Sequence, residues 1–150
     1  MKIMQKIVVL FLLLAFCAGL SAGSDEPAEP STLEIKKLPF SDAVRVGNLL
    51  FLSGNIGVLP GSLELVAGGI AAQTRQTMQN IKATLEKYGS SLEEVVKCTV
   101  FMADISEWSE MNKAYIVFFP GTPPARSALG TSGLALGARV EIECIATVAE

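Results

Sequence analysis

Histidine is absent from all 150 residues of the chain. Its absence excludes the usual general base of enzymes, the histidine-dependent catalytic triads and most zinc sites. The sequence also lacks a CxxC spacing, a glycine-rich phosphate loop and an acidic cluster suited to a metal. Nothing in these patterns indicates a cofactor, so we expect a protein that works without one.

Charged residues are scarce in the first 23 positions. Lys2 and Lys6 precede an apolar run over 7–16, and small residues follow it. This order is typical of a secretory signal peptide, and the run is shorter than the roughly 20 residues that a transmembrane helix needs. We expect cleavage after Ala22 or Gly23. The mature protein would then be secreted or periplasmic and no longer attached to the membrane, whereas the alternative is an uncleaved anchor.

The mature chain would be acidic. Removing the two lysines of residues 1–23 leaves 10 of the 12 basic residues against 15 acidic ones, a net charge of −5. This sign argues against a general affinity for nucleic acid. Residues 24–38, polar and proline-rich at their start, are predicted to form a flexible lead-in. The folded domain is therefore expected over 39–150, which is long enough to bury a core.

Cysteine is limited to three positions, and Cys17 would leave with the signal peptide. The remaining pair, Cys98 and Cys144, raises the possibility of a disulfide in an exported protein. Both lie on apolar faces of predicted strands, so they could meet only if those strands are neighbours in a suitable register. The alternative, which we favour, is two buried free thiols.

Hydrophobic periodicity predicts the order β-β-β-α-β-α-β-β. The first strands are expected over 33–38, 43–46 and 49–53, and a central strand over 95–102. A tight turn at Gly47-Asn48 would join the second and third strands. Strands interleaved with two helices indicate an α+β fold, with one sheet that is covered by helices on one face.

The first helix is predicted over 70–88, with Gly89 ending it. Its solvated face is expected to carry Gln73, Arg75, Gln76, Gln79 and Lys82. The second helix would follow Asp104 as N-cap, with Glu107 completing a capping box. Its apolar side is expected to carry Trp108, Met111, Tyr115 and Phe118 or Phe119.

Two stretches near the C-terminus carry the candidate chemistry. Pro123 and Pro124 fix the backbone before Arg126, in a segment that we interpret as a loop. Residues 140–146 alternate strictly, so Glu141 and Glu143 point to the same side of a half-buried strand. A guanidinium beside two carboxylates forms either a structural ion pair or a small anion site.

These stretches belong to a longer pattern that resembles the Rid family, also called the YjgF or reactive-intermediate-deaminase family. The matching segments are 46–57, 72–76, 80–82, 96–104, 124–127 and 140–146, in order and spacing, within a resemblance that covers 40–148. The resemblance implies a chorismate-mutase-like fold and a homotrimer with sites between its subunits. It also implies hydrolysis of enamine and imine acids, such as 2-aminoacrylate and 2-iminobutanoate, to 2-oxo acids and ammonia.

The resemblance also assigns roles to residues. Arg126 falls on the arginine that binds the substrate carboxylate, and Glu141 on the glutamate that handles water. Ser53 and Gly54 fall on a segment of the substrate pocket, where glycine either ends a strand or lets a ligand approach the backbone. Glu143 is expected to have a structural role.

Two positions depart from the family pattern. Phe40 stands where the best-studied members have tyrosine, and Ala128 where they have cysteine. We still expect both positions to line the substrate pocket and the deaminase chemistry to survive, with an altered and more apolar substrate preference. An exported member would also need a local source of imines.

A different class of function shares part of this site. A non-catalytic trimer could bind a small carboxylate through Arg126, as a sensor or scavenger, and Glu141 would distinguish the two functions. Some family members have been described as ribonucleases or translation inhibitors. The acidic, histidine-free mature chain argues against that activity here.

Overall fold

The computed structural model describes residues 38–149. The predicted signal peptide over 1–23 lies outside these residues, as do the lead-in over 24–38 and the strand predicted over 33–38, apart from Leu38. None of the helices in the described part is long and apolar enough to cross a membrane.

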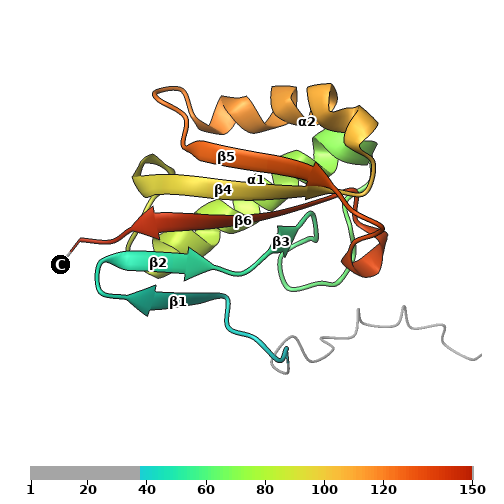
Figure 1. The fold of residues 1–150 in the computed structure, drawn as a ribbon. Helices are drawn as coiled ribbons and strands as arrows, with labels where there is room; N and C mark the ends of the chain where they lie inside the picture. The colour runs from blue at the N-terminus through green and yellow to red at the C-terminus, as the bar shows by residue number, and fades with distance from the viewer. Residues whose placement is uncertain (1–37, 150) are drawn as a thin grey trace, which may run out of the picture. The chain divides into compact units, whose positions relative to one another are not determined.

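One mixed sheet of six strands forms the first layer of the domain (Figure 1). The strands are β1 (Ala43–Val46), β2 (Leu49–Leu52), β3 (Asn55–Ile56), β4 (Val95–Met102), β5 (Ala125–Gly130) and β6 (Val140–Thr147). The sheet order is β1-β2-β6-β4-β5, and the short β3 pairs with β6. All pairs are antiparallel except β4 and β5, which are parallel and therefore need a long crossover connection.

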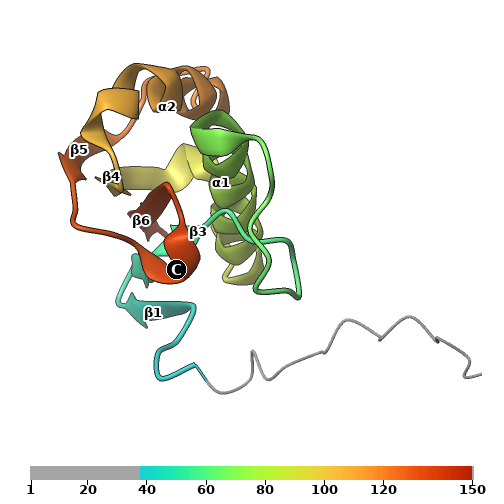
Figure 2. The ribbon, with the colours of Figure 1, turned by 90° about the vertical axis from the view of Figure 1, so that its right-hand side faces the viewer.

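Two helices form the second layer. They are α1 (Gly69–Lys87) and α2 (Trp108–Tyr115), and α2 lies in the crossover between β4 and β5. Figure 2 shows both helices on one side of the sheet, next to each other. The predicted helix over 70–88 and the fold class are thus confirmed, and Gly89 ends α1 with a positive φ of 76°.

The core lies between the sheet and the helices. Alternate residues of β4 and β6 enter it, which confirms the predicted alternation over 140–146. The fully buried side chains include Val100, Met102, Val140 and Ile142 from the sheet, and Ile70, Met78, Ile81 and Leu85 from α1. The opposite face of the sheet has no helix on it within residues 38–149 (Figure 2).

Cys98 and Cys144 are joined by a disulfide. They are direct partners in the antiparallel register of β4 and β6, and both point into the core. Our preference for two free thiols is therefore wrong. The periodicity placed both cysteines on buried faces, but it could not show that their strands are neighbours.

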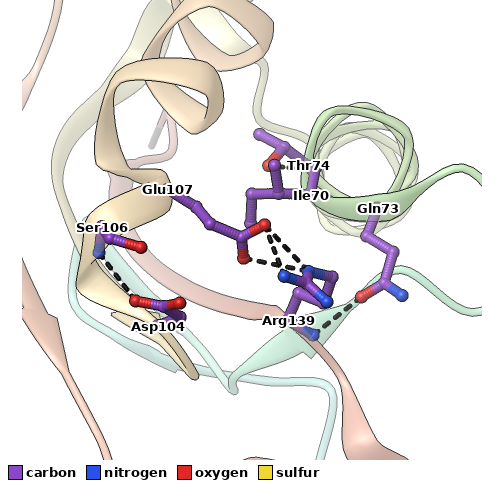
Figure 3. Close-up of polar contacts among 7 residues, drawn as sticks. All are labelled: Ile70, Gln73, Thr74, Asp104, Ser106, Glu107 and Arg139. Carbon is purple, nitrogen blue, oxygen red and sulfur yellow. Dashed lines mark hydrogen bonds and ion pairs between the residues drawn. The ribbon is translucent and has the colours of Figure 1, made fainter.

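Arg139, just before β6, lies at the centre of a polar cluster that joins both helices to the sheet (Figure 3). Its backbone N–H donates to Gln73 Oε1 at 2.8 Å, and its Nε donates to the carboxylate of Glu107 at 2.9 and 3.1 Å. Two expectations are corrected here, because Gln73 is buried instead of solvated and Glu107 binds Arg139 instead of closing a capping box. Asp104 does cap its turn, accepting from Ser106 N at 2.9 Å.

Candidate active site

Arg126 lies in a strand and not in a loop as predicted. It is the second residue of β5 and pairs with Cys98 of β4, so its side chain points to the face that the helices cover. The sequence gives little sign of this strand, because the pairing partner that defines it lies in distant β4. The consequence is that Arg126 contacts α2.

The guanidinium of Arg126 lies over two aromatic rings of α2. Its Cζ is 4.7 Å from the ring centroid of Tyr115 and 6.0 Å from that of Trp108. Both distances are within the range of a cation–π interaction, which holds the guanidinium in place without neutralising it. Trp108, predicted to lie on the apolar side of α2, is 47% exposed.

A cleft of about 540 Å³ opens beside Arg126, between α2 and the segment that precedes β5. Its lining consists of Ser109, Asn112, Lys113, Tyr115, Ile116, Pro123, Pro124 and Arg126. No carboxylate belongs to this lining, and within residues 38–149 no acidic side chain forms an ion pair with Arg126. An uncompensated guanidinium in a cleft is suited to bind a small anion.

Two buried polar atoms of this lining have no hydrogen-bond partner, Tyr115 Oη and Asn112 Oδ1. Burial raises the pKa of Tyr115 to about 12 against a smaller opposing effect of Arg126, so its hydroxyl keeps its proton. From the sequence, Tyr115 was expected on the apolar side of the helix, and Ser109, Asn112 and Lys113 were not identified as site residues. Their spacing of three and four residues on one helix was the available signal.

Glu141 lies on the other face of the sheet. It pairs with Phe101 of β4 and with Ile56 of β3, and its carboxyl group is half-buried. Burial, and secondly the negative charge of Glu143, raise the pKa of the Glu141 carboxyl. A carboxyl of this kind gains and loses a proton nearer to neutral pH than an exposed glutamate does.

Gly54 makes room for this carboxyl group. A Cβ placed on Gly54 would overlap Glu141 Oε1 and would lie 2.8 Å from Glu141 Cδ. The two positions predicted to share a pocket are thus in direct contact. Glycine is required here because a side chain approaches the backbone.

Ser53 binds the backbone of the segment that enters β1. The Ser53 hydroxyl donates to the carbonyl of Ser41 at 2.7 Å, and Ser53 N donates to the carbonyl of Asp42 at 3.0 Å. Phe40, next to Ser41 in sequence, is 55% exposed. Ala128 lies apart from both, packed against the core on the same face of β5 as Arg126.

The predicted site residues therefore form two groups within one chain. Gly54 and Glu141 are together, whereas Arg126 and Ala128 lie on a different strand and on the opposite face of the sheet. Arg126 and Glu141 do not form the ion pair that their types could suggest.

The helix-free face of the sheet is partly apolar. Val44, Phe51 and Leu129 point to it and are 55%, 41% and 43% exposed. A depression of about 350 Å³ on β2, β4 and β6 is lined by Phe51, Leu52, Lys97, Thr99, Glu143, Cys144 and Ile145. We call the helix-free face of the sheet the open face.

Comparisons with known proteins cover nearly all of the described chain. The family described as "Endoribonuclease L-PSP" matches residues 33–148. A protein of Bos taurus named 2-iminobutanoate/2-iminopropanoate deaminase is 42% identical over 108 residues, which are 72% of this chain and 79% of that protein.

Solved structures agree with this match. A yeast protein, YEO7, has a TM-score of 0.72 at 44% identity, covering 75% of this chain and 89% of its own. The structure of E. coli TdcF with bound serine has a TM-score of 0.71 at 32% identity, covering 75% of this chain and 91% of its own.

Proposed function

Since the chain belongs to the endoribonuclease L-PSP family, which includes the Rid (YjgF) proteins, we propose that it hydrolyses enamine and imine acids to 2-oxo acids and ammonia. The expected substrates are 2-aminoacrylate, 2-iminobutanoate and similar compounds. The observation that carries the proposal is the guanidinium of Arg126, which lies in a cleft without a carboxylate partner among the described residues. A relative whose structure holds serine, an amino acid, supports binding of a small carboxylate.

Arg126 would bind the carboxylate of the substrate with two parallel hydrogen bonds. The stacking of its guanidinium on Tyr115 and Trp108 limits its motion, so the carbon of the C=N bond is held in one place. In its protonated form the imine is already electrophilic. The protein has only to position it and to supply water.

Glu141 would act on the water. Its carboxylate accepts a proton as the water oxygen bonds to the imine carbon, which gives a tetrahedral amino alcohol. Glu141 then returns the proton to the amino group. The C–N bond breaks as the hydroxyl forms the C=O bond, and the departing ammonia takes up the hydroxyl proton, so the products are a 2-oxo acid and ammonium. The raised pKa of Glu141 suits a group that must both take and give a proton.

A second copy of the chain would complete the site. Arg126 and Glu141 of one chain lie on opposite faces of the sheet, so they cannot hold the same small substrate. We propose a homotrimer in which the Arg126 cleft of one subunit meets the Gly54–Glu141 surface of the next. The apolar residues of the open face would then be buried between subunits.

The proposal extends to an exported protein, secreted or periplasmic, after cleavage of residues 1–23. The Cys98–Cys144 disulfide supports this location, since disulfides persist mainly in oxidising compartments. Phe40 and Ala128 would make the pocket more apolar than one with tyrosine and cysteine at these positions. The imine source outside the cytoplasm would be an oxidation of amino acids.

The test is a turnover assay on the purified protein. 2-Iminobutanoate and 2-aminoacrylate are generated in situ, and release of the 2-oxo acid is compared with spontaneous hydrolysis. We expect acceleration in the wild type, none in Arg126→Ala, and carboxylate binding without turnover in Glu141→Gln. No acceleration by a well-folded wild-type trimer would refute the deaminase and leave a carboxylate-binding protein.

A further inference from the structure

A second cation, Lys113, lines the Arg126 cleft. Ser109, Asn112, Lys113 and Ile116 of α2 and its C-terminal extension recur at intervals of three and four residues, so they form one stripe along the cleft. Arg126 faces this stripe from β5, and Pro123 and Pro124 lie at the other wall. The cleft therefore carries two positive charges from two different elements.

No acidic side chain of the described chain lines this cleft or forms an ion pair with either cation. Three other basic side chains of residues 38–149 do have acidic partners, in the pairs Lys82–Glu86, Lys87–Asp42 and Arg139–Glu107. Lys113 and Arg126 have none. Glu107 and Glu110 do not line this cleft, but they line a neighbouring depression that Lys113 also borders.

The cleft of a single subunit has a volume of about 540 Å³, within the range of small-molecule sites. The next subunit of the proposed trimer would cover part of it. The lining also contains Ile116 and Pro124, which suit methylene groups and not further charges. The cleft thus combines two cations with apolar side chains.

We propose that Lys113 binds a second carboxylate at the far end of the substrate, and that this protein prefers imino dicarboxylates over imino monocarboxylates. This inference rests on the proposed function and gives its substrate class. Arg126 would hold the carboxylate next to the imine carbon, as proposed above, and Lys113 would hold the carboxylate at the other end of one or two methylene groups. Compounds of this form are 2-iminosuccinate and 2-iminoglutarate.

The test compares kcat/KM for 2-iminoglutarate with kcat/KM for 2-iminobutanoate in full-chain protein. Lys113→Gln should lower this ratio about fivefold, which is the largest effect expected from the loss of one exposed ion pair. Lys113→Arg keeps the charge and should preserve the ratio. Lys82→Gln is the matched control, because it removes the same charge from α1, outside the cleft, and should leave the ratio unchanged. A ratio that Lys113→Gln does not change would overturn the inference.

Binding of the product analogues separates this inference from the deaminase itself. Calorimetry would compare the Kd of 2-oxoglutarate with that of 2-oxobutanoate in the wild type and in Lys113→Gln. A preference for 2-oxoglutarate that falls about fivefold with Lys113→Gln supports the second anion site even in a protein without turnover. Equal affinities for both acids in the wild type would refute the site even if the deaminase is active.

Discussion

Mixing two inactive variants should restore activity if each site takes Arg126 from one subunit and Glu141 from another. Arg126→Ala removes the carboxylate anchor and Glu141→Gln removes the proton carrier, so each variant alone is expected to be inactive. In a mixed oligomer, an Arg126 from the Glu141→Gln chain can meet a Glu141 from the Arg126→Ala chain. Such an interface contains a complete site.

The sheet geometry explains why Arg126 and Glu141 of one chain cannot form a site together. Arg126 pairs with Cys98 and Glu141 pairs with Phe101, so the two residues lie on strands at either side of β4 and three residues apart along it. With strands about 4.8 Å apart and about 3.3 Å per residue, their Cα atoms are about 14 Å apart, and the side chains point to opposite faces. In a 2-imino acid the carboxylate is bonded directly to the reacting carbon. One chain therefore cannot place both groups on it.

The assay refolds the two variants together from denaturant at equal concentration, so that subunits mix at random. In a cyclic trimer each interface then has about one chance in four of receiving both intact residues, and the mixture should reach about a quarter of the wild-type rate. Each variant refolded alone is the control, and light scattering after gel filtration checks the trimer. A stable mixed trimer with no activity would show that the site does not form across subunits, and a monomeric wild type with full activity would refute the geometry altogether.

Four further outcomes follow from the same structure. Gly54→Ala should lower kcat about 100-fold, because the new Cβ would push the Glu141 carboxyl group aside, and a displacement near 1 Å has an effect of this size. The melting temperature should change little. A normal kcat would disprove the contact. Glu143→Gln removes a negative charge that raises the pKa of Glu141, so the acidic limb of the pH profile of kcat/KM should shift to lower pH, and an unshifted limb would exclude Glu141 as the titrating base. The raised pKa of Glu141 also means that folding disfavours its charged form. The free energy of unfolding should therefore fall as the pH rises from the ordinary glutamate pKa, 4.5, through the raised pKa of Glu141. Chemical denaturation at several pH values should show this fall in the wild type and not in Glu141→Gln. Reduction of the Cys98–Cys144 disulfide, which closes a separation of 46 residues, should lower the free energy of unfolding by about 2–4 kcal/mol, and dithiothreitol should not affect the Cys98→Ala/Cys144→Ala variant.

The regular elements could be predicted because their signals are local. The alternation of Val140 to Ala146 and the helical spacing from Ile70 to Leu85 each reflect one buried face, and both faces are buried as expected. The segment around Arg126 was interpreted as a loop, and the start of β5 was thus misplaced, because residues Ala125–Gly130 are exposed or only half-buried. This strand forms through its pairing with β4, which the local sequence does not encode.

Gln73 shows a second limit of local patterns. A glutamine on a helix is expected in solvent, yet this one is 7% exposed because its amide oxygen accepts the N–H of Arg139. The partner lies at the start of β6, far along the chain. This hydrogen bond to a backbone N–H forms only in the tertiary structure, so hydrophobic periodicity cannot predict it.

For the site, the sequence indicated the residue types but not their arrangement. Arg126, Glu141 and Gly54 were identified through the family resemblance, and the contact between Gly54 and Glu141 agrees with a common role. The placement of Arg126 and Glu141 on opposite faces depends on the sheet order β5-β4-β6. Sheet order is a long-range property, and no spacing in the sequence specifies it.

The contact between Gly54 and Glu141 also constrains how this protein can change during evolution. Any side chain at position 54 would require the space that the Glu141 carboxyl group fills. A side chain at position 54 becomes acceptable only after the residue at position 141 has become smaller, because the two groups would occupy the same space. The two positions therefore form one evolutionary unit, and an alanine at position 54 should be accompanied by an aspartate or a smaller residue at position 141.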